Sequence, residues 1–384
     1  MAFIYAICFI KMIRILFTIP NFDSAGSGKA LLHVAKRMDT SQFEVNIACF
    51  HNRGSFFKEV EKSGIPVHVF NTTTKIKPYF KGLKACYHIS KKFKAINPDI
   101  IHSFHYAGDY TEALAAKMAG IKWVYTKKNM NWGGGSKNGW YLRTYLASAI
   151  AVQNTDMMSD FFSNSQKTTL IPRGVDVDMF RPIKKDEHLI QKWGLHSNHR
   201  IIMCVANLVP VKGIEVLLEA FNKIADQYSD WKLMIVGDND NPYGKKMLEL
   251  TAELGIKEKV VFCGKQTNIQ NYLSIAEVVV LPTLNKGRKE GSPVALLEAM
   301  ASGKTVLGSN ISGIKDQLQA FPKHLVTAGN VEDWATALQE CCSNSKEKNE
   351  TLGMAFRTHV IKNYHIDLEV NRCQELYFKL INKS

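Results

Sequence analysis

The stretch Glu290-Gly-Ser-Pro-Val-Ala-Leu-Leu-Glu298-Ala-Met sets two carboxylates eight positions apart, with a predicted helix start between them. Ser292 suits the N-cap of that helix and Pro293 its first position. Glu290 then lies in the loop before the helix, and Glu298 projects from its second turn. Backbone amides at a helix start, such as that of Val294, bind phosphate readily. The stretch therefore offers phosphate donors between two hydroxyl-binding carboxylates, which matches the layout of a nucleotide diphosphate sugar.

Two glutamates beside a helix start are common in proteins, because a carboxylate is favourable at the positive end of a helix. The surrounding sequence favours a functional role for this pair, because five further segments typical of one family occur around it in the family's order. These segments are Val205-Ala-Asn-Leu-Val-Pro-Val-Lys212-Gly213, Leu233-Met-Ile-Val-Gly237-Asp238, Val260-Val-Phe-Cys-Gly264, Ala276-Glu-Val-Val-Val-Leu-Pro282 and Met300-Ala-Ser-Gly303-Lys-Thr-Val306.

Together the six segments resemble the retaining nucleotide-sugar glycosyltransferases of family four, which have the GT-B fold. The resemblance is carried by residues 201–318, thins toward the N-terminus, and extends over nearly the whole chain. It implies a hexosyl-type glycosyltransferase (EC 2.4 class) that moves a sugar from a nucleotide diphosphate sugar to a hydroxyl acceptor. The anomeric configuration of the transferred sugar is expected to be retained.

Short apolar runs alternate with amphipathic segments through most of the chain, a pattern typical of parallel α/β sheets. A polar stretch at 181–200 divides this alternation into two sets, and long helical segments are predicted over 355–380. Strands are predicted at 13–19, 43–50, 67–70, 99–103, 123–126, 149–153, 168–171, 201–206, 232–236, 260–263, 278–281 and 305–308.

The length of 384 residues gives room for two domains, each with its own core. By resemblance we expect a Rossmann-like acceptor-side domain at 12–182 and a Rossmann-like donor-nucleotide-binding domain at 183–355, facing a central cleft. Residues 356–384 are expected to form a C-terminal helix that packs back on the first domain. Ligands bind at the carboxyl ends of parallel strands, so both domains should contribute to one site.

The formal net charge of +14 and the pI near 9.3 allow three kinds of partner, which are nucleic acid, an anionic membrane surface and acidic substrates. Nucleic acid is the weakest option, because neither zinc-finger spacing nor an RNA-binding aromatic motif accompanies the basic residues. A solvated basic face and an anionic membrane surface both remain open. We favour the membrane, because enzymes of the resembling family often act on lipid-linked acceptors.

The eight cysteines show no CxxC spacing, which is typical of a reduced, cytoplasmic protein. Residues 1–10 are apolar but too few to span a bilayer, which takes about 20. No cleavage site for a signal peptide is evident there. This extension is open to two interpretations, an artefact of the start site or a weak membrane toehold. We expect a cytoplasmic protein, with peripheral attachment to the inner face of the cell membrane as an option.

Lys212 ends a loop before a predicted helix, where an ammonium can neutralise a diphosphate. A solvent-facing lysine is the plain alternative, but the preceding Pro210 and Val211 resemble the donor-binding motif. The family usually has an arginine five residues earlier, where this chain has Asn207, a donor-binding candidate whose amide can donate hydrogen bonds but supplies no charge. Arg173 or Arg288 is a conceivable replacement for that charge.

The segment Gly26-Ser-Gly28-Lys29 follows the first predicted strand. It is not a Walker P-loop, because Asp23 and Ala30 stand where that motif needs glycine and serine or threonine. What remains is a glycine loop at a helix start, which lets a ligand approach the backbone closely. By resemblance Gly28 borders the donor phosphates, whereas a plain strand-to-helix turn is equally open.

Two histidines stand at the end of the predicted strand 99–103. By resemblance one of them touches the transferred sugar, and we choose His105 over His102 because the strand end should face the site. A histidine without a role is the alternative. Arg173-Gly174-Val-Asp176 resembles a structural turn of the family. The glycine-rich loop 132–140 is either part of the acceptor pocket or a surface loop.

The resemblance assigns a role to each residue of the site. Glu290 hydrogen-bonds the donor sugar and Glu298 the ribose, while Lys212 and the segment from Gly291 to Val294, through Ser292 and Pro293, stabilise the departing diphosphate. The sequence offers no carboxylate pair that suggests a metal clamp, so we expect no metal and no other cofactor. A donor phosphate oxygen is expected to take the acceptor proton.

The nucleotide (UDP or GDP), the sugar and the acceptor, saccharide or lipid-linked, stay open. The family setting is cell-envelope polysaccharide or lipopolysaccharide biosynthesis. Two other functions compete with glycosyl transfer. One is a non-hydrolysing sugar-nucleotide epimerase of the same fold, and the other is a basic, non-enzymatic protein that binds membranes or nucleic acid.

Overall fold

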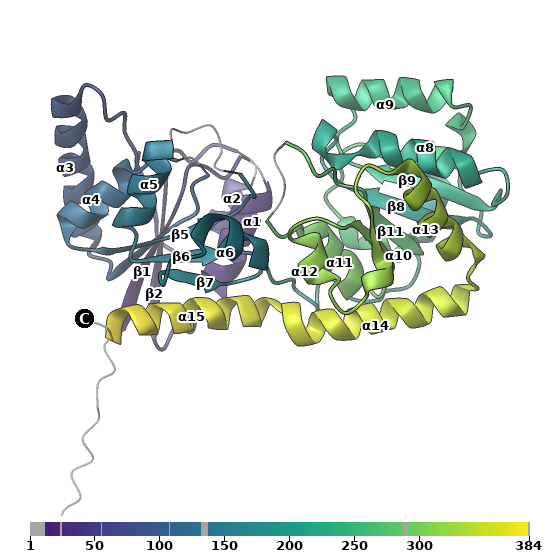
Figure 1. Cartoon of the computed structure of the whole chain (residues 1–384). Helices are drawn as coiled ribbons and strands as arrows, with labels where there is room; N and C mark the ends of the chain where they lie inside the picture. The colour runs from purple at the N-terminus through teal and green to yellow at the C-terminus, as the bar shows by residue number, and fades with distance from the viewer. Residues whose placement is uncertain are drawn as a thin grey trace, which may run out of the picture.

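The computed structural model describes residues 12–23, 25–54, 56–106, 108–131, 137–287 and 291–382. Two parallel sheets lie side by side, each between layers of helices (Figure 1). The first has seven strands in the order β3-β2-β1-β4-β5-β6-β7, and the second has six in the order β10-β9-β8-β11-β12-β13. Glu290 and Arg288 fall outside the described residues, as do 132–136 of the glycine-rich loop.

The first sheet is built around β1, which pairs with β2 from Ile13↔Phe43 and with β4 from Ile15↔Ile100. Its strands are β1 (Ile13–Ile19), β2 (Phe43–Cys49), β3 (Val67–Val69), β4 (Ile100–Ser103), β5 (Lys122–Lys127), β6 (Ala149–Val152) and β7 (Thr168–Leu170). Its helices are α1 (Ala25–Lys36), α2 (Phe57–Glu61), α3 (Tyr79–Ile96), α4 (Thr111–Ala119), α5 (Lys137–Leu146) and α6 (Thr155–Phe162).

Alternating residues of β1 enter opposite faces of this sheet, as the strand period requires. Ile15 and Phe17 pack with α1, α2 and the last helix of the chain. Leu16 packs with α3, α4, α5 and α6 on the other face. The first domain therefore has two hydrophobic cores, one on each side of the sheet.

The second sheet consists of β8 (Arg200–Val205), β9 (Trp231–Val236), β10 (Val260–Phe262), β11 (Val278–Leu281), β12 (Thr305–Ser309) and β13 (Leu325–Val326). Its helices are α7 (Glu187–Lys192), α8 (Ile214–Ile224), α9 (Pro242–Glu253), α10 (Ile269–Ile275), α11 (Val294–Ala301), α12 (Ile314–Gln317) and α13 (Val331–Ser343). Short 3-10 turns occur at η1 (Pro210–Lys212), η2 (Lys257–Lys259) and η3 (Pro322–His324). Ile202 packs with α8 and α13, and Met203 with α10 and α11 on the opposite face.

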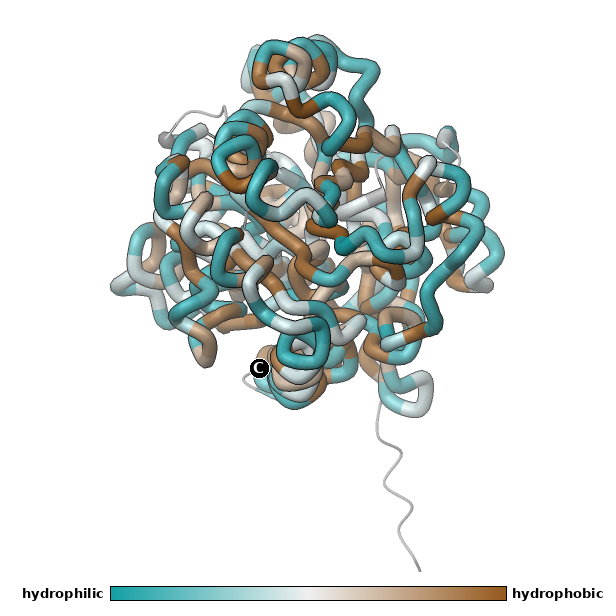
Figure 2. The backbone as a smooth tube through the Cα atoms, turned by 90° about the vertical axis from the view of Figure 1, so that its right-hand side faces the viewer, coloured by the Kyte–Doolittle hydropathy of each residue, from teal (hydrophilic) through white to brown (hydrophobic). Residues whose placement is uncertain are grey.

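Two long helices, α14 (Lys346–Tyr364) and α15 (Ile366–Asn382), run beneath both sheets (Figure 1). Phe356 and Val360 of α14 belong to a core of the second domain, whereas Val370 and Tyr377 of α15 belong to a core of the first. The chain thus crosses back to its first half at residue 365. Figure 2 shows hydrophobic positions running through the inner elements and hydrophilic ones on the outer turns and helices.

The structure corrects several sequence-based expectations. The first helix begins at Ala25, so Gly26-Ser-Gly28-Lys29 forms its first turn and not a loop before it. Helices α5, α6 and α7 have no counterpart among the elements predicted from the sequence. Asn154 caps α6 and Asp186 caps α7, each through its side-chain oxygen, so a capping signal was present in the sequence.

Candidate active site

Loops at the carboxyl ends of both sheets meet at Gly291, three residues before the start of α11 at Val294. The side-chain Nδ2 of Asn154, after β6, donates to the main-chain oxygen of Gly291 at 2.6 Å. A Cβ on Gly291 would lie 2.7 Å from the carbonyl oxygen of Lys128 and 2.8 Å from Oε1 of Gln153. A glycine is therefore required here, because the backbone of the second domain touches that of the first.

A second set of contacts joins α6 to the loop and helix around α12. The backbone nitrogen and the hydroxyl of Thr155 donate to the carboxylate of Asp316 at 2.7 and 3.0 Å. Asp156 accepts from the hydroxyl of Ser312 at 2.6 Å and pairs with Lys315 at 2.8 Å. These five residues, Thr155, Asp156, Ser312, Lys315 and Asp316, form what we call the interdomain latch.

The start of α11 differs from the expectation that Ser292 is the N-cap and Pro293 the first helical residue. Pro293 has extended backbone angles (φ −72°, ψ 116°) and occupies the N-cap position, so the helix begins at Val294. Ser292 does not cap the helix because its hydroxyl accepts from Nε2 of Gln317 at 3.0 Å. No side chain of the described residues caps the first turn of α11, which leaves its amides for a ligand.

Glu298 lies one turn farther along α11. Burial raises the pKa of its carboxyl to about 7, and the positive charge of Lys29 on α1 acts against this shift. The first turn of α1 and the second turn of α11 are therefore close enough to interact electrostatically.

Lys128, at the end of β5, gathers three parts of the first domain. Its Nζ donates to the main-chain oxygen of Phe104, lies 3.4 Å from the hydroxyl of Ser27 and stands 3.8 Å from the centre of the Tyr106 ring. The hydroxyls of Ser27 and Tyr106 are hydrogen-bonded to each other. Lys128 thus links the start of α1 to the loop after β4, beside Gly291.

The neighbouring Lys127 has a different role, although the sequence presents the two as one basic cluster. It is buried, and its Nζ donates to the carbonyl oxygen of Asn129 at 2.6 Å and to that of Asn131. Burial lowers the pKa of Lys127 to about 7. Lys127 therefore holds the loop that follows β5, whereas Lys128 belongs to the site.

Lys212 lies in η1 and is 9% exposed, on a backbone that is tightly fixed. Gly213 has a φ of 64°, and a Cβ there would strike the carbonyl oxygen of Pro282. The backbone nitrogen of Leu284 donates to the oxygen of Val211 at 2.8 Å. The loop that leads from β11 toward Glu290 is therefore anchored beside Lys212. Asn207 is exposed in the loop after β8.

Gly28 is buried in the first turn of α1, where a Cβ would lie 2.8 Å from the Phe22 ring and 3.3 Å from the Phe56 ring. Packing against these two rings is enough to require glycine. The contact of Gly28 with the donor phosphates stays a prediction, because the space where its Cβ would lie is bordered by these two core rings.

The two histidines of the β4 end have different surroundings. Nδ1 of His102 lies 2.6 Å from the Tyr377 hydroxyl and Nε2 lies 2.8 Å from the Thr126 hydroxyl, so this ring joins β4, β5 and α15. His105 follows the strand and lies 3.2 Å from the hydroxyl of Thr72. Burial lowers the pKa of His105 to about 4, so its ring is neutral near pH 7. A neutral ring can bind a sugar hydroxyl but supplies no charge.

Two buried charged residues, Glu112 and Arg143, lie around His105 and were not predicted from the sequence. Oε1 of Glu112 lies 3.6 Å from Nε2 of His105, and the other carboxylate oxygen accepts from the Ser103 hydroxyl at 2.5 Å. The Arg143 guanidinium is fully buried, donates to the carbonyl oxygen of Asp109 at 2.7 Å, and stacks on aromatic rings. This network fixes the backbone on which His105 stands.

Arg173 does not replace the missing arginine of the phosphate site. Its Nη1 is paired at 2.6 Å with Glu369 of α15 and is buried there. The same carboxylate accepts from the backbone nitrogen of Gly174 at 2.7 Å. Asp176 accepts from the backbone nitrogens of Asp178 and Met179, which confirms its role as a turn residue.

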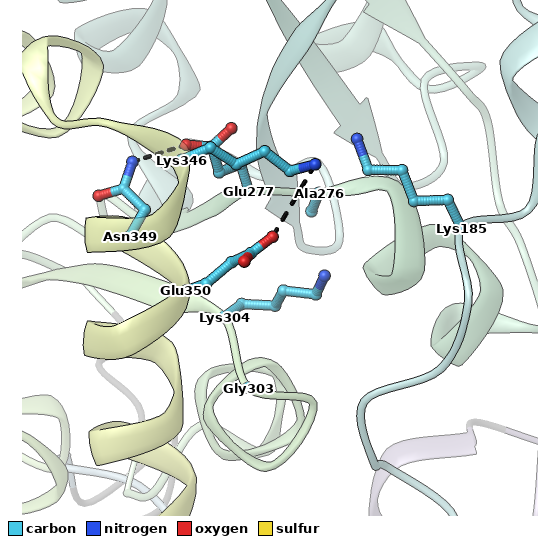
Figure 3. A pocket seen from close by; sticks show the side chains of 8 residues that line it. All are labelled: Lys185, Ala276, Glu277, Gly303, Lys304, Lys346, Asn349 and Glu350. Carbon is cyan, nitrogen blue, oxygen red and sulfur yellow. Dashed lines mark hydrogen bonds and ion pairs between the residues drawn. The ribbon is translucent and has the colours of Figure 1, made fainter. Parts of the chain in front are cut away.

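A small pocket lies at the opposite edge of the second sheet (Figure 3). Glu277 directly precedes β11 and Lys304 directly precedes β12, so both stand at the amino ends of their strands. Asn349 donates to Glu277 at 2.7 Å, and burial lowers the pKa of Lys304 to about 8. This pocket is therefore separate from the contacts around Gly291. Its lining residues are Lys185, Ala276, Glu277, Gly303, Lys304, Lys346, Asn349 and Glu350.

The described residues contain neither a metal-binding cluster nor a membrane-spanning helix. Among them, no group of three or more histidine, cysteine, aspartate or glutamate side chains is placed to hold a metal ion. None of the helices in the described ranges is both long and apolar enough to cross a membrane.

Two family models match the chain, one for each half. The model for "Glycosyltransferase Family 4" matches residues 24–179, and the model for "Glycosyl transferases group 1" matches residues 185–358. A relative in Escherichia coli, UDP-Gal:alpha-D-GlcNAc-diphosphoundecaprenol alpha-1,3-galactosyltransferase, is 24% identical over 383 residues. The match covers 93% of this chain and 94% of that protein.

Solved structures share the architecture. A glycosyltransferase from Rickettsia africae superposes with a TM-score of 0.84 at 23% identity, covering 97% of this chain and 100% of that one. Anabaena HepE, solved in complex with UDP and glucose, gives a TM-score of 0.79 at 20% identity, covering 94% and 98%. These matches confirm the predicted GT-B fold.

Proposed function

The chain belongs to the family-four glycosyltransferases with the GT-B fold, which transfer hexosyl units in glycoconjugate assembly, and from this premise we propose its donor, stereochemistry and acceptor. The donor is a nucleotide diphosphate sugar, UDP-linked in the first instance and GDP-linked as the alternative. The sugar passes to a hydroxyl with retention of anomeric configuration. The observation that carries the proposal is the contact between the two domains at Gly291, which lies beside the uncapped first turn of α11.

The donor would be held by its three chemical parts. The ribose hydroxyls bind Glu298, and the diphosphate lies on the amides at Val294 with Lys212 and Lys29 nearby. The transferred sugar binds Glu290, which lies outside the described residues, and the neutral ring of His105. This assignment is supported by the order of the residues along α11 and by the fixed backbone around Lys212.

In the reaction, the bond between the anomeric carbon and the diphosphate oxygen breaks, and the electron pair leaves with the nucleotide diphosphate. The acceptor hydroxyl forms the new bond on the same face of the sugar. A donor phosphate oxygen takes the hydroxyl proton, so no protein base is needed. Lys212, Lys29 and the α11 amides stabilise the charge that grows on the leaving diphosphate, the interaction that usually contributes most to such catalysis. No metal is required in this proposal.

The acceptor is a saccharide or a lipid-linked saccharide of the cell envelope, as in polysaccharide or lipopolysaccharide biosynthesis. The E. coli relative is named for an acceptor linked to diphosphoundecaprenol, which supports the lipid-linked option. Such an acceptor would place the enzyme in the cytoplasm at the inner face of an anionic membrane.

A ligand panel followed by product analysis tests the proposal. Thermal shift with UDP-glucose, UDP-galactose, UDP-N-acetylglucosamine and GDP-mannose should raise the Tm with one nucleotide class, because a ligand that binds only the folded state stabilises it. Proton NMR of the glycoside made from an α-linked donor should show an α product. A β product, or no rise in Tm with any of the four nucleotide sugars, would contradict the proposal. Incubation of the donor alone checks for an epimer.

A further inference from the structure

A lysine-rich segment of the first domain has no acidic residue to balance it. Residues 75–94 contain seven lysines and neither aspartate nor glutamate. All seven lysines are exposed, and five of them belong to α3. The seven are Lys75, Lys77, Lys81, Lys84, Lys91, Lys92 and Lys94. This is the strongest local concentration of the charge that makes the whole chain basic.

The same helix exposes large apolar side chains. Phe80 is 83% exposed, Tyr79 61%, Tyr87 52% and Leu83 45%. Phe80, Leu83 and Tyr87 follow each other at intervals of three and four residues, so they form one stripe along the outside of α3. The core of the domain does not account for this stripe, because Cys86, Ile89 and Phe93 fill the inner face.

A second helix of the same layer also exposes large aromatic side chains. Tyr141 and Tyr145 of α5 are 71% and 68% exposed, one helical turn apart. Both α3 and α5 contact α4 on the same face of the first sheet, and Figure 1 shows the three helices together at the outer end of the first domain. We call the exposed residues of α3 and α5, with Lys75 and Lys77, the α3–α5 surface.

We infer that the α3–α5 surface docks the enzyme on an anionic lipid bilayer. Phenylalanine and leucine beside lysines on one helix are typical of a helix that lies in the membrane interface. Tyrosine prefers the headgroup level, and lysine stems extend along apolar surface while their ammonium groups reach lipid phosphates. Nζ of Lys91 stands 4.8 Å from the centre of the Tyr87 ring, so charge and ring are presented together.

The docking surface belongs to the domain that also carries His105 and Lys128, the proposed acceptor side. Docking would therefore bring that side to the bilayer in which a lipid-linked acceptor resides. Only this consequence rests on the proposed function. The binding itself needs neither donor nor acceptor and can be measured without them.

Vesicle binding of the full chain tests the inference. Co-sedimentation should show binding to vesicles of phosphatidylcholine with 30% phosphatidylglycerol, and little binding to phosphatidylcholine alone. The charge reversal Lys81→Glu with Lys84→Glu should weaken binding at least about tenfold. The reason is that each lysine near an anionic lipid surface raises the affinity about fivefold. Phe80→Ser with Leu83→Ser should weaken it at unchanged net charge.

Matched controls come from α9 of the second domain. Lys245→Glu with Lys246→Glu makes the same charge change at exposed positions, and Leu248→Ser removes a side chain that is 40% exposed. Neither control should alter vesicle binding. Equal losses in the α3 and α9 charge variants would show that net charge alone is responsible, and would overturn the inference.

RNA binding and the Tm response to nucleotide sugars provide two further tests. Tight binding of a single-stranded 20-nucleotide RNA without vesicle binding would overturn the inference in favour of a nucleic-acid partner, because aromatic rings and lysines also suit stacked bases. The Tm response to nucleotide sugars should be the same in all four variants, measured without vesicles. Normal vesicle binding without any Tm response would reject the proposed function and leave the docking surface standing.

Discussion

Asn154 and Gly291 join the two halves of the chain, since the side-chain amide of Asn154 donates to the main-chain oxygen of Gly291 at 2.6 Å. Gly291 follows Glu290 in the chain and precedes α11, so this hydrogen bond ties the loop before α11 to the first domain. The proposed donor site is therefore complete only while the domains are in contact. The interdomain latch beside it maintains that contact.

The first prediction concerns the latch. Asp316→Ala removes both hydrogen bonds from Thr155, each worth about 1 kcal/mol, and should let the domains separate. We expect a larger radius of gyration by small-angle X-ray scattering and donor binding weakened about three- to tenfold. Asp160→Ala, an exposed change on α6, is the control. A variant with unchanged scattering and unchanged affinity would show that the latch is not needed for the closed arrangement.

Much of the fold could be predicted from the sequence, because strand and helix periods are local properties. The predicted strand 13–19 coincides with β1, whose odd-numbered isoleucines face one core and whose Leu16 faces the other. The short strand β13 was not predicted, since two residues show no period. Helix α6 was also missed, although Asn154, Thr155 and Asp156 carry an N-terminal capping signal.

The site was harder to predict because its contacts join distant parts of the chain. Asn154 and Gly291 are 137 positions apart, and Thr155 and Asp316 are 161 apart. Sequence periodicity contains no information about such pairs. Lys128 could have been found by the rule that ligands lie at the carboxyl ends of strands, since it directly follows β5.

The second prediction separates the two glutamates of the deciding stretch. Glu298→Ala should weaken binding of the nucleotide diphosphate about tenfold or more, because a hydrogen bond to a charged group contributes about 1.5–3 kcal/mol. Glu290→Ala should bind nucleotide nearly normally and chiefly lower kcat. Isothermal calorimetry and steady-state kinetics measure these quantities. Full binding and full turnover in both variants would show that the site is misassigned.

The third prediction distinguishes the two histidines at the end of β4. His102→Leu leaves the buried hydroxyls of Tyr377 and Thr126 without their partner, and should destabilise the protein by about 1–3 kcal/mol. His105→Ala should lower kcat more than it lowers the Tm. Thermal denaturation and kinetics of both variants give the comparison. The opposite ranking would assign the catalytic contact to His102.

The fourth prediction concerns metal ions. We expect transfer activity to survive dialysis against EDTA, because Lys212, Lys29 and the α11 amides are proposed to stabilise the leaving diphosphate. The assay compares initial rates before and after chelation, with magnesium or manganese added back. Loss of activity in EDTA and its recovery with either ion would contradict this part of the mechanism.

The fifth prediction uses the titration of Glu298, whose pKa burial raises from 4.5 to about 7 in the folded protein. The folded carboxyl holds its proton more tightly than the unfolded one, so this group reduces stability as the pH rises from 4.5 to 7. Below pH 4.5 the carboxyl is protonated in both states and does not lower the free energy of unfolding. Above pH 7 it lowers that free energy by the full amount. A rise of about 2.5 in the pKa corresponds to at most about 3.4 kcal/mol, and contact of the carboxyl with solvent makes the actual cost smaller.

Glu298→Gln keeps the shape of the side chain and removes the titration. The Tm of the variant minus that of the wild type should therefore grow between pH 4.5 and pH 7 and level off above pH 7, by a few degrees in all. Differential scanning calorimetry at half-unit pH steps measures this difference directly. A difference that stays flat across the window, or one that shrinks, would show that the Glu298 carboxyl is well solvated.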